Sequence, residues 1–442
     1  MFPPFLILIA LAAEPNLARD EVIEAMRPFS GESTTSRIDH STLTGKVMCG
    51  YQGWFAAEGD GSGRGWRHYP HRGQFQPGSC SIDLWPDVTE LEVDERYPTP
   101  FRHADGQVAH VFSSTNRKTV LRHFRWMNAY GIDGVFVQRF GVETVEPRDL
   151  RHCNTVLAHC REGANLQGRC YAVMYDLSSL PEGGTQIVID DWKLLVEKMQ
   201  IGKHEKDLAY LHHDGKPVVA VWGIGFNDGR KYTLAECERL IDFLKNDAKY
   251  GGFTVMIGVP TGWRTLDADS VVDPMLHRVL AQADIISPWT VGRYASLKQI
   301  EEHAQRRWKP DLDWCRERKK RYLPVVFPGF SWRNSHPNAR FDEIPRLSGN
   351  FLWRQFVEAK RAGASMVYVA MFDEMDEGTA IFKCANDVPV GTSRFVTFDG
   401  LPSDHYLWLT GVGRRLILGG IQPTTEPPQR ADGEDHENPR RN

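Results

Sequence analysis

Four acidic side chains stand within five positions near the end of the chain: Asp373, Glu374, Asp376 and Glu377. They follow the apolar, β-rich run Met366–Met371. Carboxylates this close raise the pKa of at least one member, so one carboxyl can stay protonated as a general acid while another is ionised as a base. Glu374 and Glu377 are three residues apart, which on a helical turn places their Cβ atoms roughly 5–6 Å apart. This suits the carboxyl separation of about 5–5.5 Å in retaining glycosidases.

The acidic cluster has other interpretations. It could be a solvated acidic loop, or a site for calcium or another hard cation, which carboxylates and backbone carbonyls bind. A metal-dependent hydrolase could use Asp373, Glu374 and Asp376 with histidines, but no His-x-His or Glu-x-x-His pattern supports it. The eight cysteines form no CxxC pair and no Cys/His zinc spacing, so no metal and no cofactor is predicted.

Further candidate site residues follow the other β-rich runs. They are aromatic, amide, basic or acidic residues: Tyr51, Trp54, Gln138, Arg139, Tyr175, Asp176, Trp222, Trp289 and Trp332. Together with Asp373 and Asp376 they are predicted to bind substrate, because aromatic rings stack on sugars and polar groups bind sugar hydroxyls. Core packing is the alternative for the aromatic residues, and capping of the following turn is the alternative for Asp176.

Eight short β-rich runs predict an α/β fold, a parallel (β/α)8 TIM barrel. The runs are Lys46–Tyr51, Gly134–Gln138, Tyr171–Tyr175, Pro217–Trp222, Thr254–Val259, Ile285–Trp289, Pro324–Phe327 and Met366–Met371. Segments of helical composition are Lys118–Tyr130, Arg148–Arg161, Asp190–Met199, Leu234–Tyr250, Leu297–Arg307, Asn350–Ala362 and a closing helix, His405–Leu418. An open doubly wound sheet is the alternative, but no G-x-G-x-x-G turn follows the first run. In a barrel the active site forms at the carboxyl ends of the strands, where the candidate residues stand.

Composition and the chain ends complete the domain prediction. The apolar run Met1–Ala13 is predicted to be a signal peptide, so the protein is expected to be exported, with some cysteines in disulfides. The barrel is predicted over 14–420, with a long insertion over its mouth at about 53–108 and a disordered tail at 421–442. A net charge of only -4 suggests neither nucleic acid nor, once the leader is removed, a membrane as partner.

Two motifs carry a resemblance to a known family. The segment Phe372-Asp-Glu-Met-Asp-Glu-Gly-Thr379 resembles the F-N-E-W-x-E-G-T signature of glycoside hydrolase family 99 and the broader 71/99-like group, which contain endo-α-1,2-mannosidases. Gly50-Tyr-Gln-Gly-Trp-Phe55 is similar to the Y-x-x-W-Y segment that ends the first strand of the family. The chain departs from the signature at Asp373, Met375 and Asp376, where the family has Asn, Trp and often His.

The resemblance implies roles for the two glutamates. Glu374 would deprotonate the 2-hydroxyl of the substrate, which displaces the leaving group through a 1,2-anhydro sugar, and Glu377 would be the acid/base. The prediction is therefore a retaining glycoside hydrolase acting on oligosaccharides or polysaccharides with α-linked sugars, with mannosides as the leading substrate. The alternatives are a barrel that binds carbohydrate without turnover, and a hydrolase of another α-glycan containing glucose, xylose or arabinose.

Overall fold

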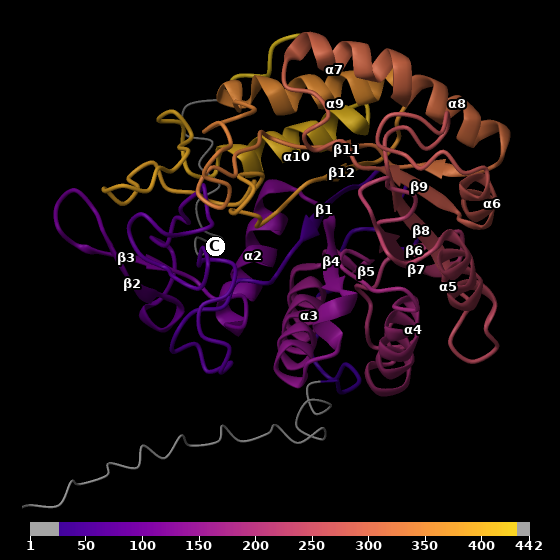
Figure 1. The fold of residues 1–442 in the computed structure, drawn as a ribbon, viewed down its shortest axis with the longest axis horizontal. Helices are drawn as coiled ribbons and strands as arrows, with labels where there is room; N and C mark the ends of the chain where they lie inside the picture. Colours follow the sequence, from indigo (N-terminus) through magenta and orange to yellow (C-terminus); the bar gives the residue numbers. More distant parts are fainter. Residues whose placement is uncertain (1–25, 431–442) are drawn as a thin grey trace, which may run out of the picture.

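In the computed structural model, which describes residues 26–430, eight parallel strand segments form a barrel (Figure 1). Seven are single strands: β1 (Val47–Tyr51), β4 (Gly134–Phe140), β5 (Cys170–Asp176), β7 (Lys216–Trp222), β8 (Thr254–Val259), β9 (Ile285–Pro288) and β12 (Val367–Val369). The eighth segment comprises β10 (Arg321–Tyr322) and β11 (Val325–Val326). β10 pairs with β9 and β11 pairs with β12, so this segment closes the ring. The predicted TIM barrel is confirmed, and each predicted β-rich run overlaps one segment.

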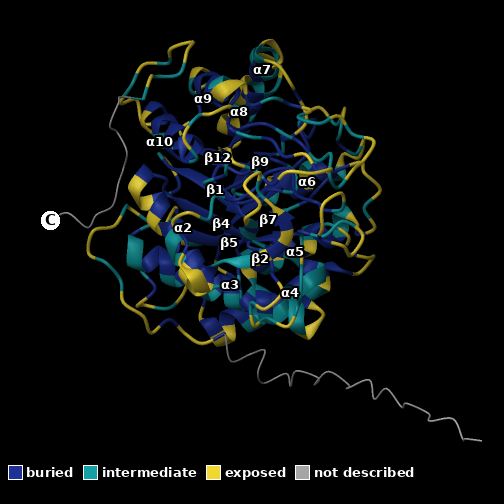
Figure 2. Cartoon of the chain, turned by 90° about the vertical axis from the view of Figure 1, so that its left-hand side faces the viewer, coloured by how far each residue is buried: buried dark blue, intermediate teal, exposed yellow. Residues whose placement is uncertain are grey.

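The barrel strands are buried because their sequences are continuously apolar. Every residue of β5 and of β8 is buried, which is the pattern of parallel strands covered on both faces. Figure 2 shows the strands in dark blue at the centre, with exposed residues on the outer helices and loops. The core of the protein therefore lies in the barrel and between the barrel and its helices.

The outer helices begin and end at residues suited to those positions. They are α2 (Arg117–Tyr130), α3 (Pro147–Gln167), α4 (Thr185–Leu194), α5 (Leu234–Asn246), α6 (Met275–Gln282), α7 (Leu297–His303), α8 (Lys309–Glu317), α9 (Asn350–Ala362) and α10 (His405–Ile417). The side chain of Asn116 caps the start of α2, and Gly131, with φ 73°, ends it. Thr233 and Glu236 form a capping box at the start of α5.

The predicted helices differ from the observed ones in extent and number. Helix α4 begins at Thr185, five residues before the predicted start, and continues into a π-helical turn, η3 (Leu195–Met199). Helices α6 and α8 were not predicted, and α8 follows α7 through a second π-helical turn, η4 (Ala304–Trp308). Helix α6 has only eight residues, too few for its apolar spacing to stand out in the sequence.

Two long loops lie together beside the mouth of the barrel. The loop after β1 contains the antiparallel hairpin of β2 (Tyr97–Arg102) and β3 (Val108–Val111), within the predicted insertion. The loop between β12 and α10 pairs with it through the bridges Leu84–Val396, Pro86–Cys384 and Arg102–Val390. In Figure 1 the indigo hairpin therefore lies beside the orange and yellow loops from the other end of the chain. A shorter hairpin strand, β6 (His212–His213), pairs with β7.

The described part of the predicted tail contacts the barrel. Arg430 forms an ion pair with Asp404, with N–O distances of 2.6 and 2.9 Å, and the Trp353 indole donates to the backbone oxygen of Thr424. Two residues of the segment 421–430 thus have partners in the barrel domain, and the disorder predicted for 421–442 stays a prediction. The predicted signal peptide, 1–13, and residues 431–442 lie outside the described residues. No helix within 26–430 has both the length and the apolar character needed to cross a bilayer.

Candidate active site

A cavity of about 200 Å³ lies at the carboxyl end of the barrel strands. Its walls come from the loops after β1, β5, β9 and β12 and from the ends of β4, β5 and β7: Gln52, Trp54, Gln138, Phe140, Asp176, Ser178, Trp222, Trp289, Glu374 and Glu377. Seven of these ten residues are among the predicted site residues, and they meet at the end of the barrel where active sites form. The barrel thus brings together residues that are more than 300 positions apart in the sequence.

Glu374 is buried at the edge of this cavity and is held on both carboxylate oxygens. The side-chain amide of Gln52 donates to one oxygen at 2.8 Å, and the Thr379 hydroxyl donates to the other at 2.8 Å. Burial, followed by the negative charges of Glu377 and Asp376, raises the pKa of Glu374 well above its ordinary value. Glu374 is therefore fixed in orientation and has an increased affinity for a proton.

Glu377 lies on the turn that follows and faces the same cavity. The turn is fixed through its backbone, because the Ser331 amide donates to the Glu377 carbonyl at 3.0 Å and Arg346 donates to the Gly378 carbonyl at 2.8 Å. The Glu377 carboxylate forms no hydrogen bond or ion pair with the residues that the structure describes. Burial, then the charge of Asp376, raises its pKa to about 7. A free carboxyl that titrates near neutrality is suited to donating and accepting a proton.

Four residues that line the cavity with the two glutamates each carry a buried polar atom without a protein partner. Two are carbonyl acceptors, on the side chains of Gln52 and Gln138, and two are indole donors, on Trp54 and Trp222. All four residues line the cavity. Buried polar groups are normally hydrogen-bonded, so these four atoms indicate a ligand or water that supplies both donors and acceptors.

Aromatic rings form two walls of the cavity. On one wall, Trp54 and Phe140 have ring centroids 5.4 Å apart, and on the other Trp222 and Trp289 meet edge to face at 5.4 Å. Asp176 lines the cavity and also accepts from the Ser178 amide at 2.7 Å, so it both faces the cavity and caps a turn. Burial raises its pKa to about 6. The cavity thus combines flat apolar faces with carboxyl and amide groups, which is the composition of a sugar site.

Four predicted substrate contacts lie outside the cavity and are bound to protein groups. Arg139 forms a buried ion pair with Asp191 of α4, with N–O distances of 2.6 Å, and Tyr175 also donates to Asp191. The Tyr51 hydroxyl bonds with the ring of the buried His123 at 2.9 Å. Asp373 accepts from the backbone amides of Gln52 and Gly53 at 2.7 and 2.8 Å.

Strand geometry explains two of these four positions, those of Arg139 and Tyr175. Successive side chains of a strand point to opposite faces. Gln138 and Asp176 point into the barrel mouth, so their neighbours Arg139 and Tyr175 point towards the helices. The prediction named adjacent residues on both faces, whereas one face lines the cavity.

Trp332 and Asp376 lie near the site but do not line the cavity. The Trp332 indole donates to Glu343 at 3.2 Å, and its ring packs on His336 with centroids 3.9 Å apart. Asp376 faces His68, at 3.3 Å from its ring nitrogen. Both residues therefore belong to the loops around the mouth.

The predicted substrate-binding residues did not include Gln52, Phe140 or Ser178, and sequence reasoning missed Asp83 as a link between loops. Gln52 stands within the first motif and Phe140 two positions after Gln138, so strand alternation could have identified Phe140. The buried Asp83 carboxylate accepts from the Ser331 hydroxyl at 2.5 Å and from the amides of Arg333 and Asn334 at 2.9 and 2.8 Å. No local sequence pattern predicts this role of Asp83, because its partners are about 250 residues away in the sequence.

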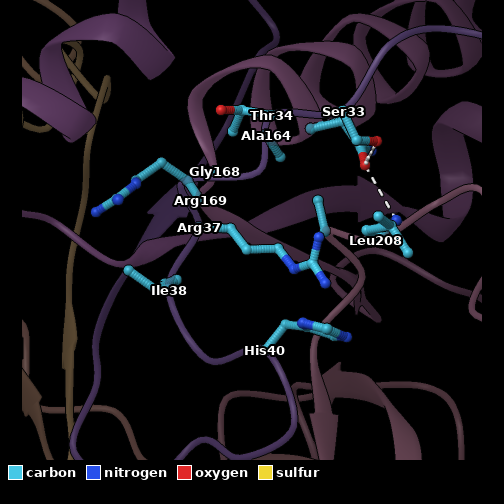
Figure 3. Close-up of a pocket in the computed structure, with 11 residues that line it drawn as sticks. Ser33, Thr34, Arg37, Ile38, His40, Ala164, Gly168, Arg169 and Leu208 are labelled. Carbon is cyan, nitrogen blue, oxygen red and sulfur yellow. Dashed lines mark hydrogen bonds between the residues drawn. The ribbon is translucent and has the colours of Figure 1, made fainter.

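A second cavity lies at the opposite, amino-terminal end of the strands (Figure 3). Arg37, His40 and Arg169 contribute to its lining, and Gly168 and Arg169 directly precede β5. The catalytic residues of barrel enzymes lie at the carboxyl ends of the strands, and no carboxyl group lines this cavity. It is therefore a poor candidate for catalysis.

Residues 26–430 contain neither a disulfide nor a group of side chains that could bind a metal ion. All eight cysteines fall within residues 49–384, and each is a free thiol, seven of them buried. The expected disulfides are thus not formed. Within residues 26–430, no three or more His, Cys, Asp or Glu side chains are grouped so as to hold a metal ion.

Solved structures share this fold. A structure of the GH99 endo-α-mannosidase from Bacteroides thetaiotaomicron matches with a TM-score of 0.63 at 16% identity, covering 86% of this chain and 99% of that chain. A second structure of that enzyme, in complex with bis-tris-propane, matches with a TM-score of 0.60 at 15% identity, covering 86% and 99%. A glycoside hydrolase-like protein matches with a TM-score of 0.51 at 15% identity, covering 86% and 96%.

The likeness to family 99 predicted from two motifs is thus confirmed for the structure over most of the chain. At these identities the likeness establishes the fold. No protein-family model and no curated protein matches the sequence.

Proposed function

We propose that this protein is a retaining glycoside hydrolase that acts on α-linked glycans, with α-mannosides as the leading substrate. The observation that supports this most directly is the cavity shared by Glu374 and Glu377, four of whose other lining residues carry a polar atom without a protein partner. A ligand with many hydroxyl groups supplies both the donors and the acceptors that these atoms lack. The tryptophan walls match the apolar faces of a sugar ring.

The two glutamates share a proton in this proposal. Gln52 and Thr379 donate to Glu374, and donors stabilise an ionised carboxylate. Glu377 has no protein donor among the described residues and titrates at about 7. Burial and the neighbouring acids raise the pKa of Glu374, which opposes its ionisation, and the donors Gln52 and Thr379 favour it. We propose that with substrate bound these donors keep Glu374 ionised as the base, and that the shared proton lies on Glu377, the acid.

The reaction proceeds in two halves. In the first, Glu374 takes the proton of the substrate 2-hydroxyl, O2 bonds to C1 as the glycosidic C1–O bond breaks, and Glu377 protonates the departing oxygen. In the second, Glu377 takes a proton from water, the water oxygen bonds to C1, the C1–O2 bond breaks and Glu374 returns the proton to O2. Two inversions at C1 give net retention.

This route favours α-mannosides on stereochemical grounds. The 2-oxygen can attack C1 only from the face opposite the leaving group. In an α-mannoside the 2-hydroxyl and the leaving group are on opposite faces of the ring, whereas in an α-glucoside they are on the same face. Hydrolysis of an α-glucan would therefore need a different mechanism.

The test is sugar release from α-linked manno-, gluco- and xylo-oligosaccharides, with the first-formed anomer followed by NMR. Wild type is compared with Glu374→Gln and Glu377→Gln, and with Glu302→Gln on the outer helix α7 as control. We expect release of an α-anomer, a loss of about 10²-fold or more in both site variants, and no change in the control.

Other outcomes overturn the proposal in distinct ways. Wild type that binds a glycan without cleaving it would make the protein a carbohydrate-binding barrel. Activity that survives in both site variants would remove the glutamates from the chemistry. Release of glucose from an α-glucan with retention would exclude the 1,2-anhydro route.

A further inference from the structure

Asp376 stands between the two proposed catalytic glutamates, and its partner comes from the long loop after β1. One Asp376 oxygen lies 3.3 Å from the Nδ1 atom of His68, and the side chains are 16% and 29% exposed. The other Asp376 oxygen is buried without a hydrogen-bond partner. Asp376 thus has a protein partner on one of its two oxygens only.

His68 is held rigidly in this place. Its ring stacks on Trp54, with centroids 4.0 Å apart and planes 4° from parallel, and Trp54 lines the cavity. Its backbone has φ 61°, a left-handed conformation that is uncommon for residues other than glycine, and its carbonyl accepts from the Ser81 hydroxyl. Such a conformation persists only where the surroundings fix it, and it is found preferentially at functional sites.

We propose, on the basis of the proposed function, that His68 and Asp376 are positioning residues. Together they control how much negative charge lies beside Glu377. Neither residue lines the cavity, so both act through the glutamate. The contact with the His68 ring shields the carboxylate of Asp376. Without this contact, the full charge of Asp376 acts on Glu377.

The surroundings of the pair are rich in acids. The titratable groups that face it are Tyr69 and Asp83 from the loop after β1, His152 from α3, and Asp373, Glu374 and Glu377 from the acidic turn. Burial lowers the pKa of His152 to about 3, so this histidine is neutral and cannot replace His68. The charge of Asp376 contributes to the raised pKa of Glu374 and of Glu377.

The experiment compares kcat/KM against pH for wild type, Asp376→Asn and His68→Asn. Asp376→Asn removes a negative charge, so the pKa of Glu377 falls and the alkaline limb moves to lower pH by about one unit. His68→Asn removes the ring that contacts the Asp376 carboxylate, so more of its negative charge acts on Glu377 and the alkaline limb moves to higher pH. Asparagine is chosen at position 68 because it tolerates the left-handed backbone.

Two further variants separate this role from a general effect. Arg72→Asn is the matched control, because Arg72 lies on the same loop, is exposed and also has a left-handed backbone, with φ 50°. It removes a positive charge away from the cavity and should leave both limbs unmoved. The double variant His68→Asn/Asp376→Asn should behave like Asp376→Asn alone, because His68 acts through Asp376.

A readout without turnover distinguishes this proposal from the proposed function. Side-chain ¹³C NMR of glutamate-labelled protein, with the Glu377 signal assigned by its loss in Glu377→Gln, reports the titration directly. If the titration moves in opposite directions in the two variants while no glycan is cleaved, the pair controls the charge and the glycosidase proposal fails.

The proposal on the pair is overturned by two results. One is an equal loss of kcat at every pH in both variants, with both limbs of the pH profile at their wild-type positions. Such a loss indicates a structural role. The other is an unchanged Glu377 titration in Asp376→Asn. Should His68→Asn fail to fold, Asp376→Asn carries the test alone.

Discussion

The replacement of Asp373 by Asn offers a test of how burial and hydrogen bonding compete at this site. Asp373 is fully buried and accepts from the amides of Gln52 and Gly53. Burial raises its pKa to about 7, and the two amide donors oppose this rise. Asn fills the same space, cannot be ionised and keeps one acceptor oxygen.

The magnitude follows from linkage between protonation and folding. The pKa of Asp373 is about 7 when folded, against about 3.9 in an unfolded chain, and each unit corresponds to ~1.4 kcal/mol. Between about pH 4 and pH 7 the folded state keeps a proton that the unfolded state has lost. Wild-type stability therefore falls with rising pH, by about 4 kcal/mol from this group. Asp373→Asn lacks this pH-dependent contribution to the free energy of unfolding, because asparagine does not ionise.

The measurement is the free energy of unfolding of wild type and Asp373→Asn, from urea titrations at several pH values between 5 and 8. The difference, variant minus wild type, should rise by about 3 kcal/mol between pH 5 and pH 7 and then level off, because only wild type must ionise a buried carboxyl. Asp105→Asn, at the exposed turn between β2 and β3, is the control, and its difference should stay constant. A constant difference for Asp373→Asn would refute the reasoning, and a falling one would mean that the two amide donors outweigh burial.

Three further predictions concern single contacts. Arg139→Ala should lower the free energy of unfolding by about 3–5 kcal/mol, because it leaves the buried carboxylate of Asp191 without its ion pair. Gly378→Ala should cost about 1–3 kcal/mol and lower kcat, because φ is 62° and the new Cβ would lie 2.9 Å from backbone atoms of Ser331, displacing the turn that carries the proposed acid. Trp54→Phe keeps a ring but loses the free indole donor, so KM should rise about five- to tenfold, which corresponds to one hydrogen bond.

Each of these variants has a matched control. Lys193→Ala removes an exposed ion pair and should change stability by less than ~1 kcal/mol. Gly59→Ala has φ 84° with no atom within 4 Å of the new Cβ, so it measures backbone strain alone. Trp332→Phe, outside the cavity, should leave KM unchanged. If a control variant changed the measured stability or kinetic constant as much as its test variant did, the contact named for the test variant would not be the cause of the change.

The sequence determined the barrel because its signal is local. Runs such as Thr254–Val259 are apolar throughout, and only strands buried on both faces need this composition. It also placed Glu374 and Glu377 at the mouth of the barrel, where both line the cavity, because both follow the last strand and the carboxyl ends of parallel strands meet at one mouth. These inferences need only the order and the type of residues.

The tertiary structure decided which candidates face the cavity and what holds them. Strand alternation places Gln138 in the cavity and turns Arg139 towards α4, and only the assembled sheet shows which face is inside. The contact of His68 with Asp376 joins residues 308 positions apart, so no local pattern encodes it. The raised pKa values have the same origin, because burial and neighbouring charge exist only once the loops have come together.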